Sequence, residues 1–336
     1  MDLDLYIWSD SFPELEQVAA SAERAGFRTL WSAELDRSAF IPVAVMARAT
    51  SEIRLGTGIA WAFPRSPMVT ALTALDLDEL CGGRLVLGLG SGVRHLNEAW
   101  LDVEWDRPVR RLDDTVRIVR ALVAGAHEGR PIRHDGAASI DLRGYRRAFQ
   151  PARTEIPVYL AAVGEQMTRL AGRTADGWLA HELGSPEYVR QRILPNVVNG
   201  LAQGGRERRD IDLVASACGM VLPDGREALR NTAGLVAFYA SVKTYTGFFA
   251  FHGFEHEALR IQALFRQGDI RGMIGAVPDE MVDALTVSGT PERAREKLAA
   301  YEGLVDTVKL SPPTHFVSKE VTRTAQQSLI DTFGVW

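Results

Sequence analysis

The stretch that most constrains the fold runs from Arg54 to Gly92 and places a capped helix between two short apolar segments. Ser66 can cap that helix, and Pro67 suits its first turn, where no hydrogen-bonding N–H is needed. Apolar residues then recur at helical spacing as far as Cys81-Gly82-Gly83, a sequence typical of a helix end. Two strands joined by a crossover helix are parallel neighbours in one sheet. The stretch therefore predicts a βαβ unit.

The same alternation of strand and helix continues along the chain. The segments predicted as strands are 3–7, 28–32, 53–59, 84–89, 156–162, 178–181, 212–221 and 305–310. Such alternation predicts a parallel sheet covered by helices, and eight units of this length fit a closed (β/α)8 TIM barrel better than an open sheet. We expect a single domain spanning residues 1–336. It would carry insertions at about 125–155, with a small hairpin, and at about 222–290, with several helical pieces.

Composition excludes several classes of protein. The formal net charge of −5 argues against nucleic acid as a partner. We find no apolar run long enough to span a membrane and no signal peptide, so we expect a cytoplasmic protein. Cys81 and Cys218 lie far apart and have no metal-like spacing, and the sequence predicts no metal site.

The glycines that follow predicted strands have more than one interpretation. Gly88-Leu89-Gly90-Ser91-Gly92 resembles a dinucleotide loop, but Val93 stands where the last glycine of that fingerprint belongs. A tight turn at the rim of the barrel is one alternative, and a place where a flat ligand approaches the backbone is another. Gly58 and Gly164 allow the same argument. The turn 162–166 opens a helix whose free N–H groups could hold a phosphate or carboxylate, or it is a plain helix start.

A few residues near strand ends could carry chemistry. His95, His181 and His252 lie near predicted strand ends or pocket-lining loops, but none has a partner at metal spacing, and a lone histidine is more often structural. Glu34 and Asp36 follow the second strand, where a barrel keeps catalytic residues, although solvated acids at the rim are the alternative. No nucleophile elbow, paired carboxylates or P-loop stands out.

Several longer motifs resemble a known family. They are Trp31-Ser32-Ala33-Glu34, Leu55-Gly56-Thr57-Gly58-Ile59, Pro64-Arg65-Ser66-Pro67, Gly82 to Gly92, Ala171 to Gly177, and Ser288-Gly289-Thr290-Pro291. On these residues the chain resembles the bacterial luciferase-like superfamily and, within it, the oxidoreductases that depend on the deazaflavin coenzyme F420. FMN is the alternative cofactor.

The resemblance implies a (β/α)8 barrel with the cofactor ring at its C-terminal face. It implies a cis peptide between Gly58 and Ile59 that bulges against the ring, and a phosphate-bearing tail near Ala162 to Gln166. Asn97 resembles the position that contacts the pyrimidine end of the ring, and Glu34 matches a position where the family often has an acid beside it. The cofactor-binding residues predicted in this way are Glu34, Gly58, Ile59, Gly90, Asn97, Ala162, Val163, Gly164, Glu165 and Gln166.

One departure bears on the chemistry. The family often shows an acid followed by histidine after the second strand, whereas Leu35 follows Glu34 here. A general base would be Glu34, His95 or His252, in that order. We expect an F420-dependent oxidoreductase that moves a hydride between C5 of the deazaflavin and a small organic substrate, with the phenylalanines of the 222–290 insertion capping an apolar pocket. The alternatives are an FMN-dependent monooxygenase using O2 and a barrel that binds the ring without turnover. By resemblance, we expect a homodimer or higher homo-oligomer.

Overall fold

A computed structural model describes residues 1–335, and its main sheet closes into a barrel of parallel strands. The order of the strands is β3-β2-β1-β11-β10-β9-β8-β5, and β3 pairs with β5 to complete the circle. The strands are β1 (Asp2–Tyr6), β2 (Thr29–Ser32), β3 (Arg54–Thr57), β5 (Leu85–Gly90), β8 (Val158–Ala161), β9 (Gly177–Leu179), β10 (Asp212–Cys218) and β11 (Thr307–Ser311). The predicted (β/α)8 architecture is confirmed.

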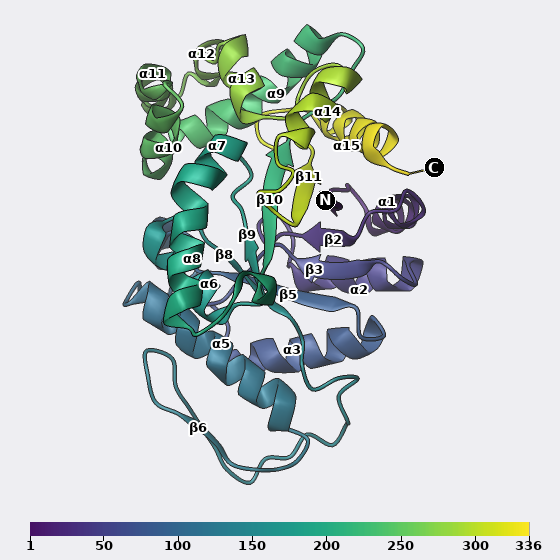
Figure 1. Cartoon of the computed structure of the whole chain (residues 1–336), viewed down its shortest axis with the longest axis vertical. Helices are drawn as coiled ribbons and strands as arrows, with labels where there is room; N and C mark the ends of the chain where they lie inside the picture. The colour runs from purple at the N-terminus through teal and green to yellow at the C-terminus, as the bar shows by residue number, and fades with distance from the viewer. Residues whose placement is uncertain (336) are drawn as a thin grey trace.

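Helices surround the barrel, as the alternation predicts (Figure 1). They are α1 (Phe12–Arg24), α2 (Phe40–Ala49), α3 (Pro67–Leu80), α4 (Arg94–Trp100), α5 (Pro108–Gly125), α6 (Glu165–Thr174), α7 (Pro186–Tyr188), α8 (Leu194–Gln203), α14 (Pro291–Ala299) and α15 (Lys319–Phe333). The predicted cap of α3 is present, because the Ser66 hydroxyl accepts a hydrogen bond from the Val69 N–H at 3.2 Å. Gly82 and Gly83 end that helix with φ values of 63° and 79°, which glycine adopts readily.

The third barrel strand was predicted as one continuous segment over 53–59, and the structure differs. It is divided into β3 and a short continuation, β4 (Ala60–Trp61), by a cis peptide bond between Gly58 and Ile59. Both pieces pair in parallel with β5. The cis bond is where the family resemblance implied it. The strand predicted over 212–221 also ends earlier, at Cys218, where β10 leaves the sheet.

The inside of the barrel is filled with side chains that form a floor beneath its C-terminal mouth. Its apolar residues are Trp31, Val86, Tyr159, Leu179 and Val214. Ile59 and Ala161 pack against this cluster while keeping part of their own surface exposed. Asp4 is fully buried and accepts a hydrogen bond from the Trp31 indole at 2.8 Å. A ligand at the mouth would therefore rest on Ile59 and Ala161.

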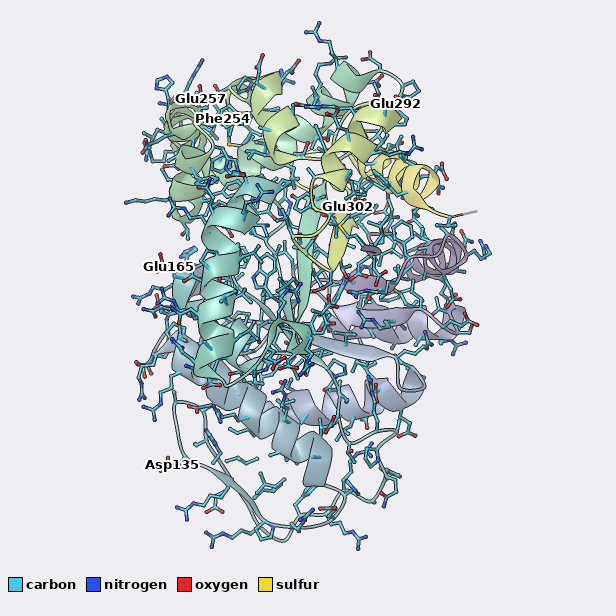
Figure 2. All side chains as sticks on the ribbon, viewed as in Figure 1. Asp135, Glu165, Phe254, Glu257, Glu292 and Glu302 are labelled. Atoms are coloured by element: carbon cyan, nitrogen blue, oxygen red, sulfur yellow. The ribbon has the colours of Figure 1, made fainter. Side chains whose placement is uncertain are left out.

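The two predicted insertions lie at opposite ends of the molecule. A hairpin of β6 (Ile132–His134) and β7 (Ile140–Leu142) projects at one end in Figure 1. The helices α9 (Gly225–Ser241), α10 (Thr246–Phe251), α11 (Glu255–Arg266), α12 (Ile270–Gly275) and α13 (Asp279–Leu285) gather at the other. Figure 2 shows the same separation, with Asp135 on the hairpin and Phe254 and Glu257 among the helices.

The helical insertion has its own apolar core, which accounts for much of its phenylalanine content. Phe249 is 0% exposed and Phe248 is 8% exposed, and both belong to the cluster formed by α9 to α13. These two rings stabilise the insertion, and Phe248 also lines a small pocket together with His181 and Tyr245. That the phenylalanine-rich insertion caps a substrate pocket stays a prediction. Among residues 1–335, no helix is both long and apolar enough to cross a membrane.

Candidate functional site

Glu34 lies at the mouth of the barrel and is held by two neighbours on the third strand and the loop after it. Its carboxylate accepts hydrogen bonds from the Arg65 guanidinium, one of them at 2.8 Å, and from the Trp61 N–H at 2.9 Å. The Glu34 N–H in turn donates to the Ile59 carbonyl at 3.0 Å. Because both carboxylate oxygens are engaged, Glu34 is built to fix the loop that carries Ile59. Its role as a general base stays a prediction.

Asn97 is buried beneath the glycine-rich loop after β5. Its side-chain amide donates to the carbonyls of Ser91 and Val93, at 2.8 and 3.0 Å, which fixes the orientation of the amide group. The remaining atom, Oδ1, is buried and has no hydrogen-bond partner in residues 1–335. A buried acceptor without a partner is costly, so the geometry suits a ligand with an N–H group.

Gly90 makes room for Ile59 at the same place. A β-carbon on Gly90 would lie 2.2 Å from Ile59 Cδ1 and 3.6 Å from Ala161 Cβ. The absence of a side chain therefore allows Ile59 to rest between β5 and β8. The predicted residues Glu34, Ile59 and Gly90 are brought together by direct contacts.

The turn before α6 provides an open helix N-terminus. The N-cap residue, Gly164, offers no side chain, and nothing lies within 4 Å of where its β-carbon would be. The Ala162 carbonyl accepts from the Trp178 indole at 2.8 Å, which fixes the chain just before the turn. The N–H groups of Glu165 and Gln166 have no acceptor within the helix, as at any helix start. The Glu165 side chain pairs with Arg169 at 3.1 Å and lies on the flank of the molecule in Figure 2.

The structure places the predicted histidines His95 and His252 in different surroundings, and their role as a general base stays a prediction. His95 is exposed on the short helix that buries Asn97. His252 lies at the end of α10, where Nδ1 is 2.8 Å from the Phe248 carbonyl and Nε2 is 2.8 Å from the Ser185 hydroxyl. Both ring nitrogens are thus occupied, and burial lowers the pKa of His252. Its contacts join α10 to the start of α7.

Sequence reasoning missed a charged group formed by residues from β11 and from the segment just after β9. Lys309 is 3% exposed, and its Nζ lies 2.8 Å from Glu182 Oε1. The Ser311 hydroxyl donates to the other carboxylate oxygen. Burial alone would raise the pKa of Glu182, but Lys309 and Ser311 hold it below its usual range. The available signals were a lysine inside an apolar strand and an acid directly after one.

His181, which the sequence marked only as a lone histidine, lies just after β9 and has one ring nitrogen without a partner among residues 1–335. Its Nδ1 accepts a hydrogen bond from the Leu183 N–H at 3.2 Å. Nε2 is buried and has no hydrogen-bond partner within the described part of the chain. Burial lowers the pKa of His181 to about 4, against the opposing effect of the Glu182 charge. The neutral ring therefore carries its proton on Nε2.

The pKa of His181 predicts a pH-dependent loss of stability. Between pH 6.5 and pH 4 the unfolded chain binds a proton that the folded chain excludes, so the free energy of unfolding should fall as the pH falls. The contribution is roughly 3 kcal/mol at most. Urea unfolding of the wild type and of His181→Phe across this range isolates it, because the other groups titrate in both proteins. A difference between the two that stays constant with pH would contradict the prediction.

Comparison with known proteins gives a consistent set of relatives. Residues 4–307 match the family described as luciferase-like monooxygenase. A 5,10-methylenetetrahydromethanopterin reductase of Archaeoglobus fulgidus is 30% identical over 308 residues, covering 89% of this chain and 90% of that protein. A putative coenzyme F420-dependent oxidoreductase of Mycobacterium tuberculosis is 28% identical over 324 residues, covering 90% and 91%.

A solved structure has the same fold. The coenzyme F420-dependent tetrahydromethanopterin reductase of Methanopyrus kandleri superimposes with a TM-score of 0.82 at 22% identity, covering 99% of each chain. At that identity the likeness concerns the fold alone, and it agrees with the barrel described above.

Proposed function

Because the chain belongs to the luciferase-like monooxygenase family, we propose that it is an F420-dependent oxidoreductase acting on a small organic substrate. The name of the Mycobacterium tuberculosis relative supports the choice of cofactor. The observation that carries the proposal is the buried Oδ1 of Asn97, an acceptor that lacks a partner in the chain and lies at the glycine-rich loop after β5. A deazaflavin ring offers a pyrimidine N–H of the kind this atom needs.

The residues of the mouth fit such a cofactor. Ile59, supported from below by the inner apolar cluster, would lie against one face of the ring. The open N-terminus of α6 at Gly164 to Gln166 would hold the phosphate of the tail, since its N–H groups and the helix dipole favour an anion. Glu34 would act through Arg65 and Trp61, by fixing the loop behind Ile59.

When bound, the deazaflavin would supply hydride transfer at C5, and the protein would supply position and exclusion of water. The chain would contribute a rigid floor at Ile59 and Ala161, and the α9 to α13 insertion would cover the opening above it.

We also propose that the barrel is one domain and that two or more copies associate. Sedimentation of the purified chain measures the second point.

Titration with cofactor tests the proposal directly. Oxidised and reduced F420 are added to the purified protein, with FMN in parallel, and binding is followed by fluorescence. Tighter binding of F420 than of FMN is expected. Binding of FMN alone, together with O2 consumption when FMN is reduced, would favour a flavin monooxygenase. F420 binding without turnover of any carbonyl or alcohol would favour a barrel that only binds.

Replacement of Asn97 by leucine should weaken F420 binding about tenfold, because it removes one hydrogen bond to the ring while keeping the side-chain volume. It also removes the two bonds to Ser91 and Val93, so its stability must be measured alongside. Asn97→Asp is the matched variant, since it keeps Oδ1 and the shape. Equal F420 affinity in the wild type and Asn97→Leu would show that Oδ1 does not face the ring.

A further inference from the structure

The imidazole of His181 presents a hydrogen-bond donor that the chain leaves unused. Leu183 fixes the tautomer by donating its N–H to Nδ1, so the ring proton is on Nε2. Nε2 is buried and finds no acceptor among residues 1–335. His181 lies two residues beyond the end of β9 and directly precedes Glu182, whose carboxylate bonds to Lys309 and Ser311 of β11. The donor therefore belongs to the mouth of the barrel.

Two tyrosine rings pack against this imidazole, and a third tyrosine lies near the same charged group. The centroids of the Tyr239 and Tyr245 rings each lie 4.4 Å from that of His181, and both come from the helical insertion. Tyr6, on β1, adds a third phenol whose pKa burial raises. None of the three hydroxyls forms a hydrogen bond within the described residues. None of them is among the buried polar atoms that lack a partner, so each hydroxyl oxygen is accessible. His181 and these three phenols are called the wall below, and none of the four side chains is charged at neutral pH. Two of them, His181 and Tyr245, also line a small cavity whose other lining residues are mostly apolar.

The charged groups described near this wall are mostly paired with one another. Glu182 is neutralised by Lys309, with 2.8 Å between their charged atoms, and Glu34 is neutralised by Arg65. Asp36, near Tyr6, is exposed and negative and would repel an anion. His315, with its ring centroid 5.7 Å from that of Tyr239, is neutral at pH 7 because burial lowers its pKa. The wall therefore favours a substrate without charge that carries a hydrogen-bond acceptor.

We propose that this wall is the substrate site and that it binds an uncharged carbonyl compound, or the corresponding alcohol, with its oxygen accepting a hydrogen bond from His181 Nε2. The inference rests on the proposed function. In the reducing direction the carbonyl carbon gains a hydride and the oxygen gains a proton. A reduced deazaflavin loses one hydride and one proton when it is oxidised, so the reaction balances. The hydride passes directly to the carbonyl carbon, and the proton reaches the oxygen by exchange with solvent. Neutral His181 polarises the oxygen and gives up no proton itself.

Two carbonyl probes that differ in charge test the inference. Methyl levulinate is a neutral keto ester, and levulinate is the same ketone with a carboxylate. Each is titrated by calorimetry into protein saturated with oxidised F420, so that no turnover takes place. His181→Phe removes the donor, and His181→Gln keeps an N–H at about the position of Nε2. The F420 affinity of both variants is measured first and should equal that of the wild type, which also shows that they fold.

We expect methyl levulinate to bind about tenfold more tightly than levulinate. His181→Phe should weaken the binding of the ester about tenfold, and His181→Gln should restore most of it. Equal affinity for the two probes, no binding of the ester, or an unchanged affinity in His181→Phe would overturn the inference. If the wild type binds no F420 at all, the proposed function fails at the first titration, and the inference fails with it.

Discussion

Replacement of Lys309 by methionine should lower the free energy of unfolding by about 3 kcal/mol. The lysine is 3% exposed, and its ammonium is the cationic partner of Glu182 at 2.8 Å. Methionine fills a similar volume but leaves the carboxylate with only the Ser311 hydroxyl. The loss should be at the low end of the range for a broken buried pair, because 25% of the Glu182 side chain remains exposed. Urea unfolding measures it as a lower midpoint with an unchanged slope.

A second substitution distinguishes the pair from simple packing. Glu182→Gln alone should also destabilise the protein, because it leaves a buried ammonium without a counterion. The double variant Lys309→Met with Glu182→Gln removes both charges, so it should lie closer to the wild type than the two single losses added together. Additive losses would show that Lys309 and Glu182 contribute independently, and the charge balance inferred for the mouth would lose its basis.

The barrel could be predicted because its signals are local. Apolar periodicity, a capping serine and paired glycines each act within a few residues, which is why the helix expected between Ser66 and Cys81 is present as α3 (Pro67–Leu80). No local signal of this kind predicted the interruption of the third strand. Residues 53–59 read as one apolar strand, and only resemblance pointed to the cis bond at Gly58–Ile59 that divides it.

The site could be predicted only in part, because its decisive contacts join distant segments. Glu34 is 31 residues from Arg65, and Glu182 is 127 residues from Lys309. No spacing rule reports such pairs, since closure of the barrel brings them together. For the same reason His252 could not be separated from His181 in the sequence. The fold gives one of them two partners for its ring nitrogens and leaves the other with a free N–H.

Gly88→Ala should prevent the barrel from folding or cost about 4 kcal/mol of stability. The added β-carbon would lie 1.9 Å from the Thr57 carbonyl oxygen, which belongs to the backbone of the neighbouring strand. Thr57 also bonds to Gly88 through its hydroxyl, at 2.7 and 2.9 Å, so neither strand can move aside without losing those bonds. Soluble yield and thermal unfolding measure the outcome.

Gly90→Ala, two residues along the same strand, is the matched control and should behave differently. Its β-carbon would lie 2.2 Å from Ile59 Cδ1, which is the end of a side chain that can rotate. The protein should therefore fold with a loss of about 1 kcal/mol, while the displaced Ile59 weakens F420 binding about tenfold. Gly88→Ala thus tests the contact between neighbouring strands, and Gly90→Ala tests the floor of the mouth. If Gly90→Ala binds F420 as the wild type does, then Ile59 does not support the ring, and the cofactor lies elsewhere on the barrel.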